Sequence, residues 1–229
     1  NIRYIILTLI KIKEVIMGGD KYVIVLAGMI GAGKTTYTRY ISEHFGSDAF
    51  YESVSDNPIL EKFYHDKERW GFALQVHFLN TRFKSIKEAL LHKNNVLDRS
   101  IYEDSLFTQI NYEQGNITEE EMNIYNSLLE NMMEEIDGMP KKSPDLLIYL
   151  RGSFDKHMQH IKKRGRDYEQ EDKQVEYFKL LHSRYDKWFS KYDKSPTLVF
   201  SIDELSIENP EDRKYILETI ETKLEEIRG

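Results

Sequence analysis

The segment Gly28–Thr35 constrains this sequence more than any other feature, because it has the spacing G-x-x-x-x-G-K-[ST]. It follows the apolar run Tyr22–Ala27, which is typical of a buried strand, and it leads into a helical pattern over Lys34–Phe45. Glycines in such a loop let the backbone curl so that its N–H groups point at phosphate oxygens, and the helix N-terminus adds a favourable dipole. The context of strand, loop and helix therefore predicts a nucleotide-phosphate site in an α/β domain.

Two side chains of this loop have the chemistry that a triphosphate needs. Lys34 is a point charge for the β- and γ-phosphates, and the hydroxyl of Thr35 is a ligand for Mg²⁺. The loop alone does not distinguish a GTPase switch, a motor and a small-molecule kinase. The predicted phosphate-binding residues are Gly28, Met29, Ile30, Gly31, Ala32, Gly33, Lys34, Thr35 and Thr36.

Short apolar runs alternate with helical patterns along the rest of the chain. Strands separated by helices imply βαβ units, so we expect an α/β fold with a five-stranded, mainly parallel sheet and helices on both faces. Thr118 followed by Glu121 predicts a capping box at a helix start. Further strands are predicted at 50–51, 95–97, 146–150 and 197–201. Further helices are predicted at 57–64, 69–92, 102–114, 118–137, 154–164, 172–192 and 210–227.

Composition excludes several partner classes for this chain of 229 residues. The formal net charge of −7 argues against nucleic acid or an anionic membrane as the main partner, because both favour a basic surface. The sequence has no cysteine, which excludes a disulfide framework and fits the cytoplasm. No repeat or linker interrupts the pattern, so we expect one domain over residues 17–229.

Residues 1–16 are predicted to be a non-native leader or a disordered tail. The apolar run within residues 2–10 is too short to span a bilayer. Lys13, Glu14 and Val15 can be encoded by a sequence that contains a bacterial ribosome-binding site, just upstream of Met17. We therefore expect Met17 to be the natural start, with a genuine N-terminal strand or tail as the alternative.

Charged residues follow two of the predicted strands. Glu52 comes directly after one strand, and Asp98 and Arg99 come directly after another. Because ligands of parallel α/β sheets bind at the carboxyl ends of the strands, these groups are expected beside the phosphate loop. One carboxylate can take an alcohol proton, the other can help to hold Mg²⁺, and the arginine can neutralise a transferred phosphoryl group. The alternatives are a solvated strand end for Glu52 and a helix N-cap for Asp98, a role for which Ser100 competes.

The helical pattern after Arg69 contains polar residues in an apolar stripe. Gln75 and Arg82 share this stripe with Phe78, Leu79 and Ile86. Buried polar groups need partners, and a glutamine amide can pair with the edge of a base. The alternative is that both residues lie at the margin of the buried face.

A compact basic segment, Lys162–Arg166, joins two helical patterns in this acidic protein. We interpret it as a lid in which Arg164 and Arg166 close over a triphosphate. The alternative is an ordinary helix end, where lysine and arginine complement the dipole.

Several spaced motifs together resemble the deoxynucleoside kinases, most of all the bacterial deoxyadenosine/deoxyguanosine kinases of Gram-positive organisms. The resemblance covers roughly Lys21 to the C-terminus and implies a P-loop kinase fold with a short lid. The motifs are Tyr51-Glu52-Ser53-Val54, Asn57-Pro58, Phe63-Tyr64, Arg69-Trp70, Gln75, Arg82, Asp98-Arg99-Ser100-Ile101-Tyr102-Glu103-Asp104, Arg164-Gly165-Arg166 with Glu169, and Glu176-Tyr177.

The resemblance also implies a reaction and a role for each matching residue. Mg-nucleotide would donate its γ-phosphoryl group to the 5′-hydroxyl of a deoxynucleoside, in nucleotide salvage, and the protein would form a homodimer through a helical interface. The implied catalytic residues are Glu52 as general base, Arg99 and Lys34. The implied acceptor-binding residues are Glu52, Arg99, Tyr64 and Glu176 at the 3′-hydroxyl, and Gln75, Arg82 and Asp104 at the base. The implied donor-binding residues beyond the phosphate loop are Arg164 and Arg166, with Thr35 and Asp98 for the metal.

Two positions depart from the family pattern. Asp98 stands where many eukaryotic members have glutamate, and His160 stands where some members have a third arginine. Arg82 and Asp104 resemble the sets of purine- and deoxycytidine-accepting members, and we expect a purine deoxynucleoside. The alternatives are a thymidylate-type kinase, which needs extra cationic groups for its acceptor phosphate, and a nucleotide-binding regulator without turnover.

Overall fold

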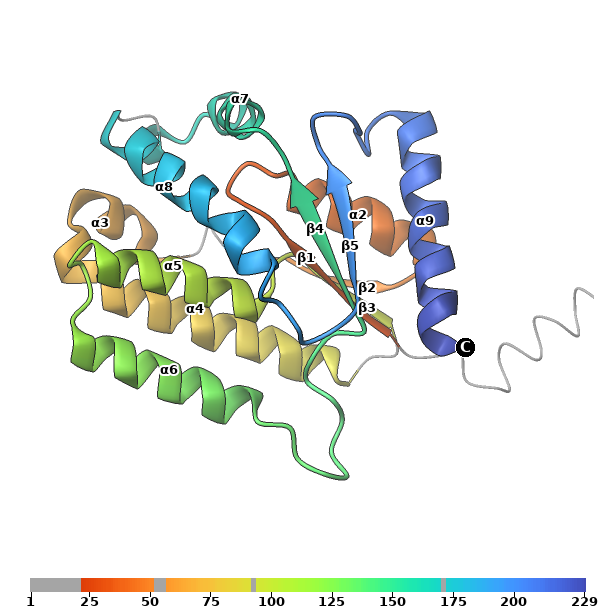
Figure 1. Ribbon diagram of the computed structural model, residues 1–229, viewed down its shortest axis with the longest axis horizontal. Helices are drawn as coiled ribbons and strands as arrows, with labels where there is room; N and C mark the ends of the chain where they lie inside the picture. The colour runs from red at the N-terminus through yellow and green to blue at the C-terminus, as the bar shows by residue number, and fades with distance from the viewer. Residues whose placement is uncertain (1–21, 52–56, 92–93, 170–171) are drawn as a thin grey trace, which may run out of the picture.

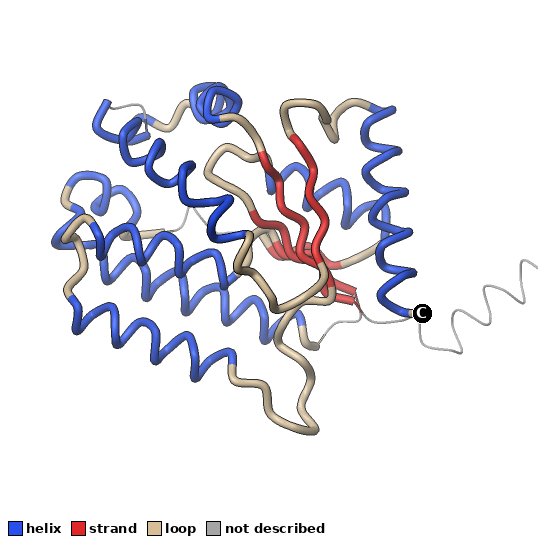
Figure 2. Tube along the Cα trace, viewed as in Figure 1, coloured by secondary structure: helices blue, strands red, loops and turns tan. Residues whose placement is uncertain are grey.

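The computed structural model describes residues 22–51, 57–91, 94–169 and 172–229. The predicted leader at residues 1–16 and the predicted base Glu52 lie outside these ranges. The strands lie together in one sheet (Figure 2). They pair in parallel in the order β2-β3-β1-β4-β5, which confirms the expected five-stranded parallel sheet. The strands are β1 (Tyr22–Ala27), β2 (Asp48–Phe50), β3 (Asn94–Leu97), β4 (Leu146–Arg151) and β5 (Thr197–Ser201).

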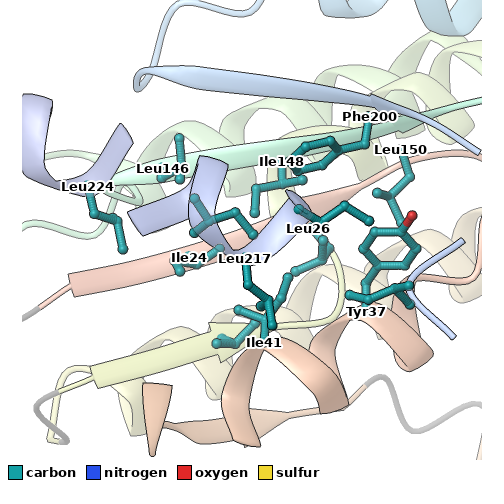
Figure 3. Close-up of a cluster of buried hydrophobic side chains, with 14 of the residues drawn as sticks. Ile24, Leu26, Tyr37, Ile41, Leu146, Ile148, Leu150, Phe200, Leu217 and Leu224 are labelled. Carbon is teal, nitrogen blue, oxygen red and sulfur yellow. The ribbon is translucent and has the colours of Figure 1, made fainter. Parts of the chain in front are cut away.

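Helices cover both faces of this sheet (Figure 1). Helices α2 (Lys34–Phe45) and α9 (Pro210–Arg228) lie on one face and enclose a cluster that includes Ile24, Ile41 and Leu217 (Figure 3). The central strands are apolar on both sides because both of their faces are buried.

The opposite face of the sheet is covered by a thicker helical layer. Helix α6 lies outermost in this layer, against α4 and α5 (Figure 1). Its helices are α3 (Leu60–His65), α4 (Lys67–Ala89), α5 (Ile101–Glu113), α6 (Glu119–Met133), α7 (Phe154–Arg164) and α8 (Asp172–Phe189), and a short 3₁₀ helix, η1 (Asp167–Glu169), connects α7 to α8. In the part of the chain that the structure describes, no helix is both long enough and apolar enough to cross a bilayer.

Some helix ends agree with the predictions and others differ for local reasons. The capping box of Thr118 and Glu121 is present at the start of α6. That helix ends at Met133 instead of residue 137, and the chain turns away before Gly138 and Pro140. Helix α3 begins at Leu60 instead of residue 57, because the preceding residues form a turn around the Asn57 side chain.

Candidate active site

The phosphate loop is held in shape by its own lysine. Lys34 is buried, and its Nζ donates to the carbonyl oxygens of Gly28 and Met29. Gly33 caps α2 in the left-handed conformation, so the helix N-terminus begins directly at Lys34. Helix α7 packs against the loop, where Nδ1 of His160 lies 2.7 Å from the carbonyl oxygen of Gly31. The loop therefore presents its backbone at the carboxyl end of β1, as the motif predicts.

Asp98 joins the phosphate loop at the carboxyl end of β3. The hydroxyl of Thr35 donates to Oδ2 of Asp98 at 2.7 Å. Ser100, and not Asp98, caps α5 by accepting from the N–H of Tyr102. The carboxylate is thus available beside the predicted triphosphate site.

These two side chains fit a magnesium ion. Mg²⁺ in phosphotransferases usually takes one or two protein oxygens and completes its shell with water and phosphate oxygens. Thr35 and Asp98 supply that number, and within the described ranges no group of three or more His, Cys, Asp or Glu side chains forms a denser metal site.

Arg99 lies next to Asp98, and its guanidinium points into the molecule. Its Nη1 lies 3.3 Å from Oε1 of Glu103, and its guanidinium carbon lies 5.2 Å from the ring centre of Phe107. Its side chain is almost fully buried, yet it lines the cavity described next. A positive charge is therefore held close to the phosphate loop.

A cavity of about 670 Å³ runs from the phosphate loop to the middle of α4 and the first half of α5. It brings together most of the predicted site residues from segments far apart in the sequence. Those that line it are Ile30, Gly31, Ala32, Gly33, Lys34, Thr35, Thr36, Tyr64, Gln75, Arg82, Asp98, Arg99, Asp104, Arg164 and Arg166. Gly28 and Met29 form the buried start of the loop and are not part of the lining.

The far end of the cavity contains the predicted base-reading set. Arg82 and Asp104 form a buried ion pair through Nε and Oδ2, and Gln75 is buried beside them. The Thr108 hydroxyl lies 3.3 Å from Oε1 of Gln75 and 2.9 Å from the carbonyl oxygen of Asp104. A hydroxyl has one proton, so its choice between these two oxygens governs which end of the Gln75 amide faces the cavity. Gln75 and Arg82 thus belong to the cavity, not to the margin of a buried face.

The predicted lid arginines converge on one buried carboxylate. Nη2 of Arg164 lies 2.7 Å from Oε2 of Glu169, and Nη1 of Arg166 lies 3.5 Å from its Oε1. The neighbouring Tyr168 stacks on Tyr64, with ring centres 5.1 Å apart. The segment after α7 is therefore coupled to the wall of the cavity that contains Tyr64.

Glu176 does not lie beside Tyr64 in this structure. Its side chain is 74% exposed and pairs with Lys179 at 2.8 Å, and it does not line the cavity. The carboxylate near Tyr64 is that of Glu169, which contributes to raising the pKa of the buried Tyr64 phenol after the larger effects of burial and Tyr177. The expected pairing of Tyr64 with Glu176 is thus corrected here, because Glu176 faces outward from α8 while the buried Tyr177 faces inward.

The cavity also includes groups to which the sequence assigned no role. Lys156 and Lys163 of α7 add positive charge beside the phosphate loop. The segment that follows β5 forms the wall on the other side of the loop, through Ile202, Leu205, Ser206, Ile207 and Glu208. Only its position after a strand could have indicated this, since its residues match no motif.

Comparison with known proteins identifies the family of this chain. The family profile described as deoxynucleoside kinase matches residues 24–225. A deoxyguanosine kinase of Lactobacillus acidophilus is 51% identical over 90% of this chain and 92% of its own length. A deoxyadenosine kinase of the same organism is 44% identical over 90% of this chain and 97% of its own.

A solved structure supports the same relationship. The deoxyadenosine kinase of M. mycoides with bound dCTP superposes with a TM-score of 0.71 at 32% identity, over 89% of this chain and 99% of that one. The residues matched by the family profile include both the phosphate loop and the predicted base-reading residues. This chain belongs to the deoxynucleoside kinase family.

Proposed function

We propose that this kinase transfers the γ-phosphoryl group of Mg-ATP to the 5′-hydroxyl of a purine deoxynucleoside, for nucleotide salvage. One observation supports this above all others: a single cavity joins the phosphate loop to the set of Gln75, Arg82 and Asp104. A triphosphate and a nucleoside therefore fit end to end, with the reacting groups between them. Relatives named deoxyguanosine and deoxyadenosine kinase favour a purine acceptor.

The acceptor base binds at the far end of the cavity in this proposal. Arg82 offers donors and Asp104 an acceptor, so the two together can pair with both kinds of group on a purine edge. Phe78 lines the same region, with the Arg82 guanidinium carbon 5.1 Å from its ring centre, and provides an apolar surface for the base. Tyr64 and Glu169 hold the sugar 3′-hydroxyl, the role that the resemblance implied for Tyr64 and Glu176.

Lys34 and Arg99 stabilise the negative charge on the phosphoryl group during transfer. Glu52 takes the proton of the 5′-hydroxyl. Support for Glu52 comes from the sheet, because the carbonyl oxygen of Phe50, two residues earlier, accepts from the N–H of Asp98 at 2.9 Å. The strand that leads to Glu52 thus ends next to the predicted metal ligand.

The donor occupies the phosphate loop, with Arg164 and Arg166 over its phosphates. Mg²⁺ held by Thr35 and Asp98 would neutralise the β- and γ-phosphate oxygens. Lys156 and Lys163 add to the positive field, and the wall after β5 provides the surface for the donor base. In this arrangement Glu169 exchanges its contacts with the lid arginines for contacts with the acceptor.

The remaining parts of the proposal concern the whole protein. We propose a homodimer whose interface includes α6, since Ile124 on this helix is 51% exposed. A cytoplasmic location stays a prediction from the absence of cysteine.

The proposal is tested by measuring ADP release with Mg-ATP and each of five acceptors: deoxyadenosine, deoxyguanosine, deoxycytidine, thymidine and thymidylate. We expect turnover with a purine deoxynucleoside and a loss of at least ~100-fold in kcat for Glu52→Gln, the usual scale for a general base, with ATP binding retained. Turnover with thymidylate alone would identify a nucleotide kinase instead. Wild-type activity in Glu52→Gln would remove this carboxylate from the chemistry.

A further inference from the structure

Glu103, on the first turn of α5, is fully buried and outside the lining of the cavity. Its Oε1 atom accepts from three donors: the N–H of Gly28 at 2.9 Å, Nη1 of Arg99 at 3.3 Å and the hydroxyl of Tyr185 at 2.5 Å. Removing a carboxylate from water is costly unless such donors compensate it. Donors from the protein itself therefore hold one oxygen of this carboxylate, outside the lining of the cavity.

The three donors belong to three different segments of the chain. Gly28 is the first residue of the phosphate loop, and its carbonyl oxygen accepts from Lys34. Arg99 lines the cavity beside Asp98. Tyr185 belongs to α8, the helix that follows the lid. One carboxylate thus connects the loop, the cavity arginine and the helix behind the lid.

The contacts of Glu103 indicate which groups its carboxylate holds in place. The N–H of Gly28 donates to Glu103, and the carbonyl oxygen of the same residue, in the next peptide group, accepts from Lys34, so the lysine is bound to a residue that this carboxylate holds in place. Burial, and then the charge of Glu103, raise the pKa of the Tyr185 phenol well above its usual range, so the phenol keeps its proton and donates. The Glu103 carboxylate is the acceptor in its contacts with Gly28, Arg99 and Tyr185.

We infer that Glu103 is a positioning residue for phosphoryl transfer: it orients the guanidinium of Arg99 and holds the start of the phosphate loop at a fixed distance from it. The inference rests on the proposed roles of Arg99 and Lys34. Glu103 acts through these groups and touches neither substrate. A geometry held in advance lowers the barrier because the charges need not reorganise when the phosphoryl group moves.

A double-mutant cycle with Arg99 tests this inference. The four proteins are wild type, Glu103→Gln, Arg99→Ala and the double variant, assayed for kcat and for KM with ATP and the purine deoxynucleoside. Glu103→Gln keeps the size of the side chain and removes its charge. We expect it to lower kcat about 10-fold to 100-fold with both KM values within about threefold, and to lower kcat by a factor at least about threefold smaller when Arg99 is already alanine, because, of its contacts with Gly28 and Arg99, only that with Gly28 then remains.

A merely structural carboxylate would give another pattern. Equal losses of kcat with and without Arg99, or no loss in Glu103→Gln, would overturn the inference. Tyr185→Phe is the matched control, because it removes one donor from the same oxygen and leaves the contact with Arg99; we expect kcat within about threefold of wild type. A loss in Tyr185→Phe as large as in Glu103→Gln would also overturn it.

A replacement variant and a check on the wild-type protein keep the result interpretable. Should Glu103→Gln fail to fold, Glu103→Asp replaces it in the cycle, since aspartate keeps the charge and withdraws it from Arg99 by one methylene. Failure of the proposed function has a different readout, namely a wild-type protein without turnover on any deoxynucleoside. With an active wild type, an additive cycle counts against the role of Glu103 alone.

Discussion

Gly31 and Gly33 of the phosphate loop have nearly the same backbone φ, 82° and 85°, but their surroundings differ. A Cβ on Gly31 would lie 2.6 Å from the carbonyl oxygen of His157, whereas a Cβ on Gly33 would meet no atom within 4 Å. We expect Gly33→Ala to cost roughly 1–2 kcal/mol of stability, from left-handed strain alone. Gly31→Ala adds a clash with backbone and should cost roughly 2–5 kcal/mol.

Urea unfolding of both variants without nucleotide measures this difference. The two substitutions add the same methyl group at nearly the same φ, so each controls for the other. Equal losses would mean that α7 moves away from the loop at little cost, and that its close packing there is not a constraint.

His157, whose carbonyl oxygen lies close to Gly31, also predicts that the stability of the protein depends on pH. Burial, then the charges of His182, Lys34 and His160, lower the pKa of His157 from 6.5 to about 3. Between these values the unfolded chain binds a proton that the folded protein does not. The contribution of this group is therefore complete above pH 6.5 and is lost as the pH falls, by about 1.4 kcal/mol per pH unit.

We expect His157→Gln to reduce the decline in the free energy of unfolding between pH 7 and pH 5, measured by urea titration at each pH. Glutamine retains a donor for the backbone contact with Ile30 and does not titrate. The exposed His65→Gln is the control and should leave the slope unchanged. A wild-type slope in His157→Gln would contradict the lowered pKa.

Residue types and spacing predicted much of the site, but not the direction of every side chain. Lys34 and Thr35 come after β1, and Asp98 comes after β3. These strands are parallel neighbours, so their carboxyl ends lie side by side and bring the three residues together. Glu103 and Glu169 stand in charged stretches without periodicity, and only tertiary packing decides that both are buried. For the same reason the sequence did not indicate which of Glu169 and Glu176 is buried near Tyr64.

At the scale of elements, the end of α7 and the short helix η1 are linked to each other and to the wall of the cavity. Arg164 ends α7, Glu169 ends η1, and Tyr168 between them stacks on Tyr64. Movement of the arginines toward a triphosphate must break their contacts with Glu169. In the proposed function, this one carboxylate therefore couples the lid to the acceptor site.

The proposed role of Glu169 predicts that two similar substitutions have very different effects on the KM for the deoxynucleoside. Glu169→Gln removes a charged partner of the 3′-hydroxyl and should raise the KM for the deoxynucleoside about 10-fold or more, the effect of one charged hydrogen bond. Glu176→Gln changes an exposed side chain and should alter the KM for the deoxynucleoside by less than about twofold. Steady-state kinetics with the deoxynucleoside varied at saturating ATP measures both. A larger effect in Glu176→Gln would restore the role that the resemblance implied for that residue.

Element boundaries were predictable where the end signals are local. Helix α7 begins and ends as predicted, because Ser153 caps its start and Gly165 adopts the left-handed conformation at its end. Helix α6 ends earlier than predicted, since Glu135 accepts from the N–H groups of Lys142 and Ser143 and so closes a loop. Such a contact spans seven or eight residues and leaves no periodic trace in the sequence.

At the scale of the molecule, the two faces of the sheet are covered unequally. Helices α2 and α9 form a single layer on one face, whereas α6 adds an outer layer to α4 and α5 on the other (Figure 1). Leu128, Leu129 and Met132 of α6 are partly buried against the core, whereas Ile124 on the same helix is 51% exposed. An outer helix with this composition has an apolar surface that a second copy of the chain can cover.

We therefore expect the proposed homodimer to depend on α6, and Ile124→Glu to dissociate it. Burial of an isoleucine contributes about 1.5–3 kcal/mol, and a buried unpaired carboxylate adds a penalty, so the dissociation constant should rise at least ~100-fold. Size-exclusion chromatography with light scattering should then give the mass of one 27.2 kDa chain in place of two. Tyr215→Glu, at a position 57% exposed on α9, is the control and should leave the dimer intact. A dimer that survives Ile124→Glu would place the interface elsewhere, because no subunit surface that buries this residue tolerates an unpaired charge there without loss of affinity.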